Sequence, residues 1–232
     1  MVSSARQVGR GGNVTIDGAD NNDDVVGGSL VNIPEDAVQE FQIATNRFSA
    51  ELGRSGSTVI NVVTKQGTNA LHGGVAIYER DKVFQGLPAT YDPSIEKTPP
   101  FHRQQYAGDM GGVFRHDQAW WFVAMEDRQQ LGADLVGVRD TTNKTISRVF
   151  ATAPLHDYLL TERVDWQARE RDRLGFRHSL QLEDDLSQSE LDRSLGTAAY
   201  RQTSMNHLQG LVADWVHIFT PLRHQPPQLC RQ

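Results

Sequence analysis

Two short segments contain residue types that could bind a ligand or an ion. Residues 20–24 (DNNDD) offer carboxylate and amide oxygens, the ligands that calcium prefers. Counted from Asp20, however, the segment lacks the Gly at the sixth position and the Glu at the twelfth of an EF-hand loop. Residues 53–57 (GRSGS) are small, as in a phosphate-binding loop, but no Gly-Lys-Ser/Thr ending follows. Both segments are therefore interpreted as turns.

The histidines and the cysteine do not form a recognisable site. The eight histidines show neither i, i+4 pairing nor His-Glu-x-x-His spacing, and Cys230 is the single cysteine. There is no Gly-x-Ser-x-Gly elbow, and no pair of carboxylates stands out. We accordingly assign no catalytic, cofactor-binding or metal-binding residue, predict no cofactor and no enzyme, and leave the ligand-binding residues unknown.

Composition and charge limit the class of protein. The chain has 232 residues, 38% of them hydrophobic, and a net charge of −6 with both signs mixed along it. This mixture gives no basic face for nucleic acid, so no nucleic-acid partner is expected. No apolar run approaches the roughly 18 residues of a spanning helix, and residues 1–6 lack the apolar region of a secretory signal. If the chain crosses a bilayer, it does so with strands.

Residues 1–69 are rich in turn formers and predict a small mixed α+β unit. Gly11, Gly12 and Asn13, and the pair Asp17-Gly18, favour loops and turns. Residues 33–40 predict a short helix, because Pro34 stands near the first helical position and acids follow it in the first turn. Residues 40–44 and 57–64 predict strands, the second one β-branched at most positions.

After residue 70, apolar and polar residues alternate over long segments. In residues 160–169, Leu160, Val164 and Trp166 share one face with Glu162 as the exception, and residues 172–184 repeat the alternation after a short charged turn. We predict six strands, at residues 71–80, 102–113, 118–128, 157–169, 172–184 and 206–219.

The lengths of these segments favour a membrane barrel. The predicted connections 81–101, 129–156 and 185–205 are long, whereas 114–117 and 170–171 are tight. Transmembrane barrels combine short periplasmic turns with longer outer loops, and their strands need about 9 to 11 residues. Trp120, Trp121 and Phe122 follow a tight turn, where an aromatic girdle would lie, although a buried aromatic cluster explains them as well.

Several segments resemble TonB-dependent outer-membrane receptors. Residues 15–21 and 33–41 are similar to plug segments in the order that this family has them, and residues 50–56 and 62–74 resemble the plug-to-barrel junction, most closely in the Oar-like branch. Residues 103–112 and 120–128 resemble the second and third barrel strands. The resemblance implies a plug that fills a barrel of about 22 strands. It also implies TonB-coupled uptake of a ligand across the cell outer membrane.

The resemblance gives a mainly β fold class, a partial transmembrane β-barrel preceded by the C-terminal part of a small α+β plug domain. The expected domains are residues 1–69 (part of the plug), 70–220 (first barrel strands) and 221–232 (an irregular tail). The segment that contacts TonB in the family is expected to be absent, and about six strands are too few to close a barrel. We therefore expect a receptor fragment that transports nothing alone. The alternative is a soluble β-rich module that binds a carbohydrate or a peptide.

Overall fold

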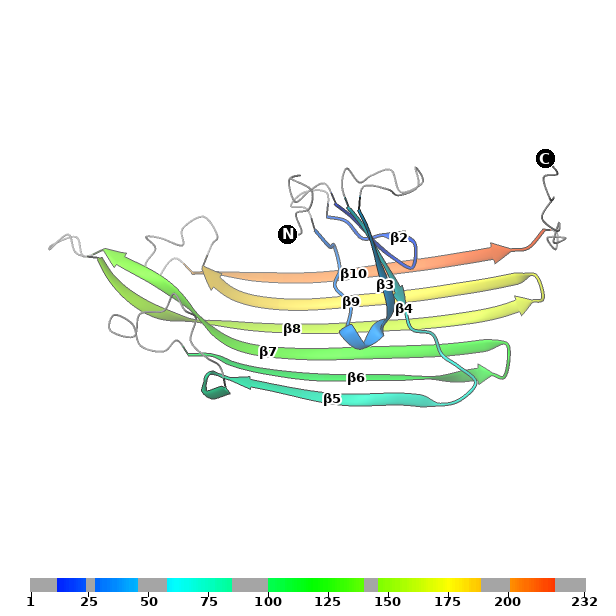
Figure 1. Ribbon diagram of the computed structural model, residues 1–232, viewed down its shortest axis with the longest axis horizontal. Helices are drawn as coiled ribbons and strands as arrows, with labels where there is room; N and C mark the ends of the chain where they lie inside the picture. Colours follow the sequence, from blue (N-terminus) through cyan, green and yellow to red (C-terminus); the bar gives the residue numbers. More distant parts are fainter. Residues whose placement is uncertain are drawn as a thin grey trace, which may run out of the picture.

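The computed structural model describes residues 12–23, 28–45, 58–84, 100–139, 146–188 and 201–219. These residues form a four-stranded sheet and a six-stranded sheet (Figure 1). Residues 24, 53–57 and 221–232, for which the sequence predicts turns and a tail, lie outside the described residues. Within the described part, no helix is long and apolar enough to cross a membrane.

The small sheet has the strand order β2-β1-β4-β3. Asp17 and Gly18 have φ values of 51° and 78°, so they form the predicted tight turn, with two left-handed residues between antiparallel β1 and β2. β1 then pairs in parallel with β4, and β3 pairs antiparallel with β4. The strand bounds are β1 Gly12–Ile16, β2 Ala19–Asp20, β3 Val38–Thr45 and β4 Thr58–Thr64.

The predicted helix over residues 33–40 is wrong in extent. Only the 3-10 helix η2, Glu35–Ala37, is present, and Pro34 before it is extended at φ −53° and ψ 141°. Val38 already has strand dihedrals, and β3 continues from it along β4. Cross-strand pairing of β-branched and aromatic residues thus overrides a weak local helical preference. Likewise β1 begins at Gly12, in a segment that the sequence predicts as a loop.

The large sheet is an antiparallel meander in the order β10-β9-β8-β7-β6-β5, and it confirms the six predicted strands (Figure 1). Short turns join β6 to β7 and β8 to β9 at one end of the sheet. The 3-10 helix η4, Lys82–Phe84, follows β5. The strand bounds are β5 His72–Asp81, β6 His102–Arg115, β7 Ala119–Arg139, β8 Ile146–Arg169, β9 Asp172–Gln188 and β10 Arg201–His217.

The predicted long connection 129–156 is mostly strand. β7 and β8 stay paired from Gln129↔His156 to Arg139↔Ile146, and β10 begins at 201 rather than 206. The sequence prediction ended each strand where apolar alternation stops. A hairpin, however, needs only continued backbone pairing, which does not require a strict alternation of apolar and polar side chains.

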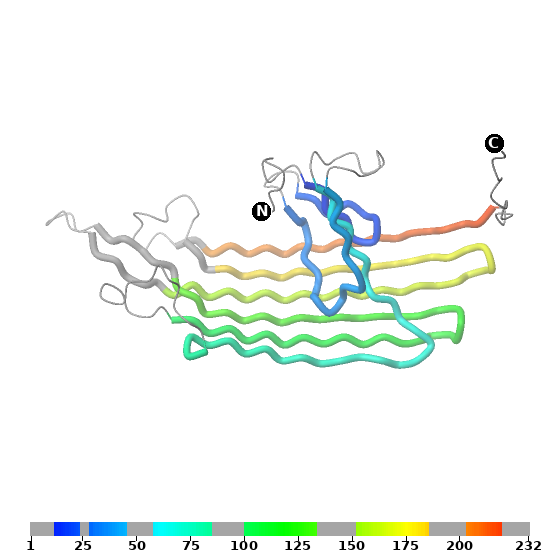
Figure 2. Tube along the Cα trace, viewed as in Figure 1, coloured from blue at the N-terminus to red at the C-terminus, as the bar shows by residue number. Residues whose placement is uncertain are grey.

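The two faces of the large sheet differ because side chains alternate along each strand. The small sheet lies over one face, the inner face, which is marked by Phe122, Ala124 and Glu126 of β7 (Figure 2). The outer face carries an apolar band across the six strands, made of Val75, Ile77, Tyr106, Met110, Trp121, Val123, Met125, Tyr158, Leu160, Val164, Trp166, Leu174, Phe176, Leu180, Leu182, Leu211 and Trp215. On β8 the band covers residues 158–166, about the length that a tilted membrane-spanning strand needs.

The predicted aromatic girdle is divided between the two faces. Trp121 is on the outer face, with its ring centroid 6.2 Å from that of Phe114, and Trp166 and Trp215 lie near the same end of the band. Phe122 is on the inner face, 1% exposed, in a small core with Ala37, Ala124 and Ile33. Trp121 is thus on the face where a girdle would lie, and Phe122 is buried among aliphatic residues rather than in an aromatic cluster.

Candidate functional site

The acidic segment at residues 20–24 contributes side chains to the fold. Asn22 Oδ1 accepts a hydrogen bond from the Val14 amide at 2.8 Å, and Asn22 Nδ2 donates to Asn13 Oδ1 at 2.8 Å. The buried Asn21 donates to the Val31 carbonyl and accepts from its amide. Among the described residues, no group of three or more His, Cys, Asp or Glu side chains could hold a metal ion.

Five of the histidines lie against carboxylates, a pattern that the sequence analysis missed. The partners come from the facing strand or the next residue, so they are far from regular i, i+4 spacing. Only the strand register reveals them. The pairs are His102 with Glu79 and Asp81, His116 with Asp117, His156 with Asp127, His178 with Glu162, and His217 with Asp172.

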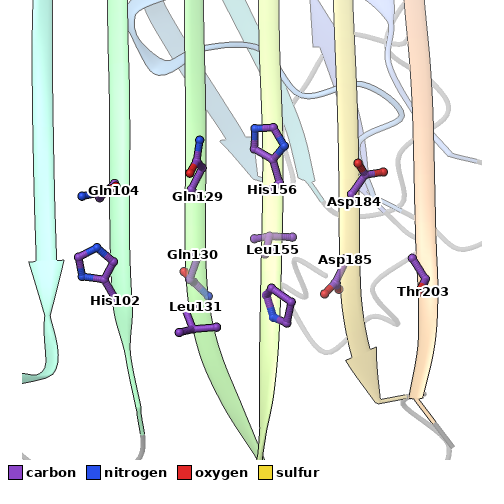
Figure 3. A pocket seen from close by; sticks show the side chains of 11 residues that line it. His102, Gln104, Gln129, Gln130, Leu131, Leu155, His156, Asp184, Asp185 and Thr203 are labelled. Atoms are coloured by element: carbon purple, nitrogen blue, oxygen red, sulfur yellow. The ribbon is translucent and has the colours of Figure 1, made fainter.

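A cavity of about 550 Å³ lies near the end of the large sheet where the long connections are (Figure 3). Eight of its lining residues occupy outer-face positions, on the side away from the small sheet: His102, Gln104, Gln129, Leu131, Pro154, His156, Asp184 and Thr203. This cavity is therefore separate from the contact between the two sheets.

The contact between the sheets centres on Asp17, in the tight turn of the small sheet. Its Oδ1 accepts from the Thr64 amide at 2.8 Å, and its Oδ2 accepts from the Thr64 hydroxyl at 2.8 Å. The Asp17 amide donates to the Val62 carbonyl at 2.8 Å. The carboxylate is thus held rigidly at the tip of the β1–β2 hairpin.

Two arginines of the inner face reach this carboxylate. Arg163 Nη1 of β8 is 3.3 Å from Asp17 Oδ1, and Arg177 Nε of β9 is 3.1 Å from Asp17 Oδ2. Arg163 also donates to the Thr64 hydroxyl at 2.8 Å, and Arg177 donates to the Ile16 carbonyl at 3.2 Å. The Arg177 Nε–H has no well-aligned hydrogen bond, so its attraction to Asp17 is mainly electrostatic. The tip of the hairpin therefore lies between two cations.

Asp165 of β8, in the large sheet, fixes the geometry of this cluster. It is 2% exposed and accepts from Arg163 through both oxygens, at 2.8 and 3.1 Å. Arg173 Nη2 donates to the same carboxylate at 2.9 Å and to Gln66 Oε1 at 3.0 Å. We call Asp17, Thr64, Arg163, Asp165, Arg173 and Arg177 the interface cluster. Bidentate arginine–carboxylate pairs are the most geometrically specific ion pairs in proteins.

A second contact forms around the 3-10 helix η2. The Asn32 amide donates to Gln181 Oε1 of β9 at 2.9 Å, and the Glu35 amide donates to Glu126 Oε2 of β7 at 3.4 Å. Ala37 of η2 is fully buried against Phe122 and Ala124. Most of this contact is made by directed polar groups, with one small apolar core between them.

The segment 65–71, which leads from β4 to β5, is tied to the end of the sheet with the short turns. Asn69 Oδ1 accepts from the Trp120 indole at 2.8 Å and from the Asp117 amide at 3.1 Å. The Asn69 amide group also donates to the Asp117 carboxylate, and this bond, together with His116, lowers the pKa of Asp117. Gly67 lies so close to the strands that an added Cβ would be 2.2 Å from the Trp121 carbonyl oxygen.

A cavity of about 310 Å³ lies on the inner face beside η2. Arg80 of β5 and Arg103 of β6 face each other directly across the strands there. Arg80 stacks over the Phe101 ring at 5.5 Å, and Arg103 donates to Gln105 at 2.7 Å. Like charges placed opposite each other are unfavourable. The residues that line the cavity are Glu35, Tyr78, Arg80, Arg103 and Gln105.

The strand architecture and the two-faced sheet agree with the comparisons to known proteins. Residues 63–137 match the family described as outer membrane beta barrel domain. In this segment the chain is similar to outer-membrane β-barrel domains, and the mainly β fold class predicted from its strands is confirmed.

The resemblance to TonB-dependent receptors is confirmed as well. The chain is 29% identical over 112 residues to the TonB-dependent transporter Oar of Myxococcus xanthus. The aligned residues make up 47% of this chain and 11% of Oar. Its fold matches the siderophore receptor PirA from Acinetobacter baumannii, with a TM-score of 0.56, 16% identity and coverage of 76% of this chain and 24% of PirA. A mutant of the ferric enterobactin receptor PfeA from Pseudomonas aeruginosa matches with a TM-score of 0.52, 13% identity and coverage of 76% and 26%. The chain therefore spans about a tenth of Oar and about a quarter of each receptor.

Proposed function

We propose that this chain forms the C-terminal part of the plug and the first wall strands of an outer-membrane receptor that takes up a ligand through TonB, and that it does not transport alone. In this proposal residues 1–69 belong to the plug, residues 70–220 to the barrel wall and residues 221–232 to an irregular tail. The observation that carries the proposal is the docking of the small sheet on the inner face through the interface cluster. The relatives are transporters and receptors, so we propose binding and passage rather than catalysis.

The electrostatics of the contact support a plug that can be moved. The interface cluster and the η2 contact consist mainly of hydrogen bonds and ion pairs, which water can replace one at a time. A large apolar interface would resist such displacement, because separation would expose all of its surface at once. A partner that pulls on the plug from the periplasm, as TonB would, needs a contact of this kind.

We also propose that ligand first meets the chain at the inner-face cavity beside η2. Arg80 and Arg103 face each other there, and Glu35 of the plug lines the same cavity. A ligand with a negatively charged group would relieve the repulsion between the two guanidinium groups. Contacts from both plug and wall would let ligand binding change how firmly the plug is held.

The proposed plug function can be tested by deleting residues 12–64 from a complete receptor that contains this chain, which we call the full-length protein. We expect the outer membrane to admit a large hydrophilic antibiotic that the intact protein excludes, at equal protein levels in the outer-membrane fraction. Uptake of the receptor's own ligand by the intact protein, in contrast to exclusion of the antibiotic, should stop when a proton uncoupler is added. Unchanged antibiotic resistance of the deletion strain, with the protein present in the membrane, would contradict the proposal.

A further inference from the structure

Glu162 and His178 interrupt the apolar band of the outer face at its centre. Glu162 is the midpoint of the band on β8, residues 158–166, and His178 is the midpoint on β9, residues 174–182. The two residues are direct cross-strand partners, with His178 Nδ1 3.0 Å from Glu162 Oε2. An ionisable pair at mid-depth of a lipid-facing surface is unfavourable unless protein covers it.

The surroundings of the pair are apolar on both sides. Val123 pairs with Glu162 from β7, and Leu211 pairs with His178 from β10. Glu162 keeps 54% of its side chain exposed and His178 keeps 23%. The outer-face pair of His156 with Asp127 lies at the edge of the band, since Asp127 pairs with Tyr158, the first band residue of β8, and His156 lies just outside it. Glu162 and His178 therefore need an explanation that the other pairs do not.

Within the described residues, the pair leaves one donor and one acceptor without a hydrogen bond. Nδ1 of His178 and Oε2 of Glu162 are used by the contact between them, and Nε2 and Oε1 have no hydrogen bond. When His178 is protonated, Nε2 carries an N–H. Each chain thus presents one N–H donor and one carboxylate acceptor, side by side on neighbouring strands.

From this arrangement we propose that the β8–β9 strip of the outer face is a contact between two copies of the protein in the membrane. A two-fold axis along the membrane normal, midway between the two residues, places Glu162 of each copy opposite His178 of the other. Each Nε2–H then meets an Oε1, so both unused groups of both copies are satisfied. Self-complementarity of this kind is the property of a two-fold interface. The flanking Leu160, Val164, Phe176 and Leu180 provide the apolar contact around the four charged groups.

The axis predicts which residues meet. Leu160 and Leu180 are direct partners within one chain, so the axis brings Leu160 of one copy opposite Leu180 of the other. The test uses two differently tagged copies of the full-length protein in its own outer membrane, both with Cys230→Ser. One copy carries Leu160→Cys and the other Leu180→Cys. We expect a disulfide between unlike copies, with like copies cross-linked at least fivefold less.

Substitutions at the pair decide whether its charges drive the contact. The double change Glu162→Leu with His178→Leu removes the pair but keeps a surface suited to lipid, and we expect cross-linking to fall at least tenfold while insertion persists. The exchanged pair, Glu162→His with His178→Glu, should retain cross-linking. The control changes Asp127→Asn with His156→Gln, at the edge of the band, should leave it unchanged.

Three outcomes would overturn the proposal. They are an absence of disulfide between unlike copies that are present in the membrane, equal cross-linking of like and unlike copies, and full cross-linking in the doubly leucine-substituted protein. Cross-linking of the cysteines to a different protein would equally contradict a second copy as the occupant. None of these outcomes depends on ligand uptake, so a failure here leaves the proposed receptor function untouched.

Discussion

Replacing Asp17 with alanine should weaken the docking of the small sheet on the large one. The change removes the carboxylate that faces Arg163 and Arg177 and leaves the cations in place. It also removes both acceptors of Thr64. The Asp17 and Arg177 side chains are only 16% and 9% exposed, so solvent cannot fully replace what is lost.

The free-energy cost of Asp17→Ala depends on how many hydrogen-bond and ion-pair partners each arginine retains. Removing one partner of a buried ion pair costs about 3–5 kcal/mol. Arg163 keeps its bidentate contact with Asp165, so most of the loss falls on Arg177, whose remaining hydrogen bonds go to Ile16 and Ser179. We therefore expect a cost of about 3 kcal/mol, on the order of a 100-fold increase in the open population.

Hydrogen exchange of the full-length protein in lipid nanodiscs measures this opening. The amide of Thr64 loses its acceptor directly, so the informative amides are those of β4 at residues 58–63, which bond only within the small sheet. These should exchange on the order of 100-fold faster in the Asp17→Ala protein. The exposed Glu40 of β3 provides the matched control, since Glu40→Ala removes a carboxylate from the same sheet without touching the cluster.

A companion variant separates electrostatics from simple loss of structure. If Arg177→Leu is added to Asp17→Ala, no uncompensated charge remains at that position, and much of the exchange protection should return. The reasoning is refuted if Asp17→Ala accelerates exchange less than threefold, or if the double variant opens more than the single one.

Three further predictions concern the contacts of the large sheet with η2 and with the segment 65–71. Gly67→Ala should destabilise the packing of segment 65–71 by about 1–3 kcal/mol, because the added Cβ would overlap backbone oxygens of the large sheet. The control Gly74→Ala has its nearest contact at 3.6 Å and should have no such effect. Amide hydrogen exchange of segment 65–71 compares the two variants. Phe122→Ala should destabilise the protein by about 3–5 kcal/mol in thermal unfolding, since it empties the core under η2; a loss below 1 kcal/mol would contradict this. Because the pKa of Asp117 is lowered from 3.8, the hydrogen bond from Asn69 to its carboxylate contributes its full stability above pH 3.8, and this contribution is lost as the pH falls through the lower pKa of the folded protein. Asn69→Ala should move the NMR titration of the Asp117 carboxyl back toward 3.8. An unchanged titration would contradict the role of Asn69.

The strands of the large sheet could be predicted because their chemistry repeats every two residues. Leu160, Val164 and Trp166 share a face in the sequence and in the structure. The ends of the strands could not be predicted in the same way. Beyond Asp127 and His156 the sequence no longer alternates regularly between apolar and polar residues, so the backbone pairing that continues to Arg139 could not be read from the alternation.

The interface cluster could not be predicted from the sequence. Asp17 precedes Arg163 by 146 residues, and the tight turn at Asp17-Gly18 gives no sign that its carboxylate faces another sheet. The arginines appeared as ordinary polar positions in alternating strands. One signal was available: Arg163, Asp165 and Arg177 all fall on the face opposite the apolar one, which in a barrel must face the interior. A charged interior face calls for charged partners.

The two faces of the large sheet show how the same alternation serves two different environments. On the outer face, lipid favours apolar side chains, and Glu162 with His178 is an exception at the centre of the band that leads to the proposed contact between copies. On the inner face Arg163 and Arg177 have a charged partner, Asp17, in the small sheet, and Phe122 with its small core is an apolar exception. An apolar contact between the two sheets would bind the small sheet more tightly, but it would also resist its displacement by a pulling force. Ion pairs fix the position of the small sheet through geometry, while each could be exchanged for water or for a ligand group if this sheet is the moving plug that we propose.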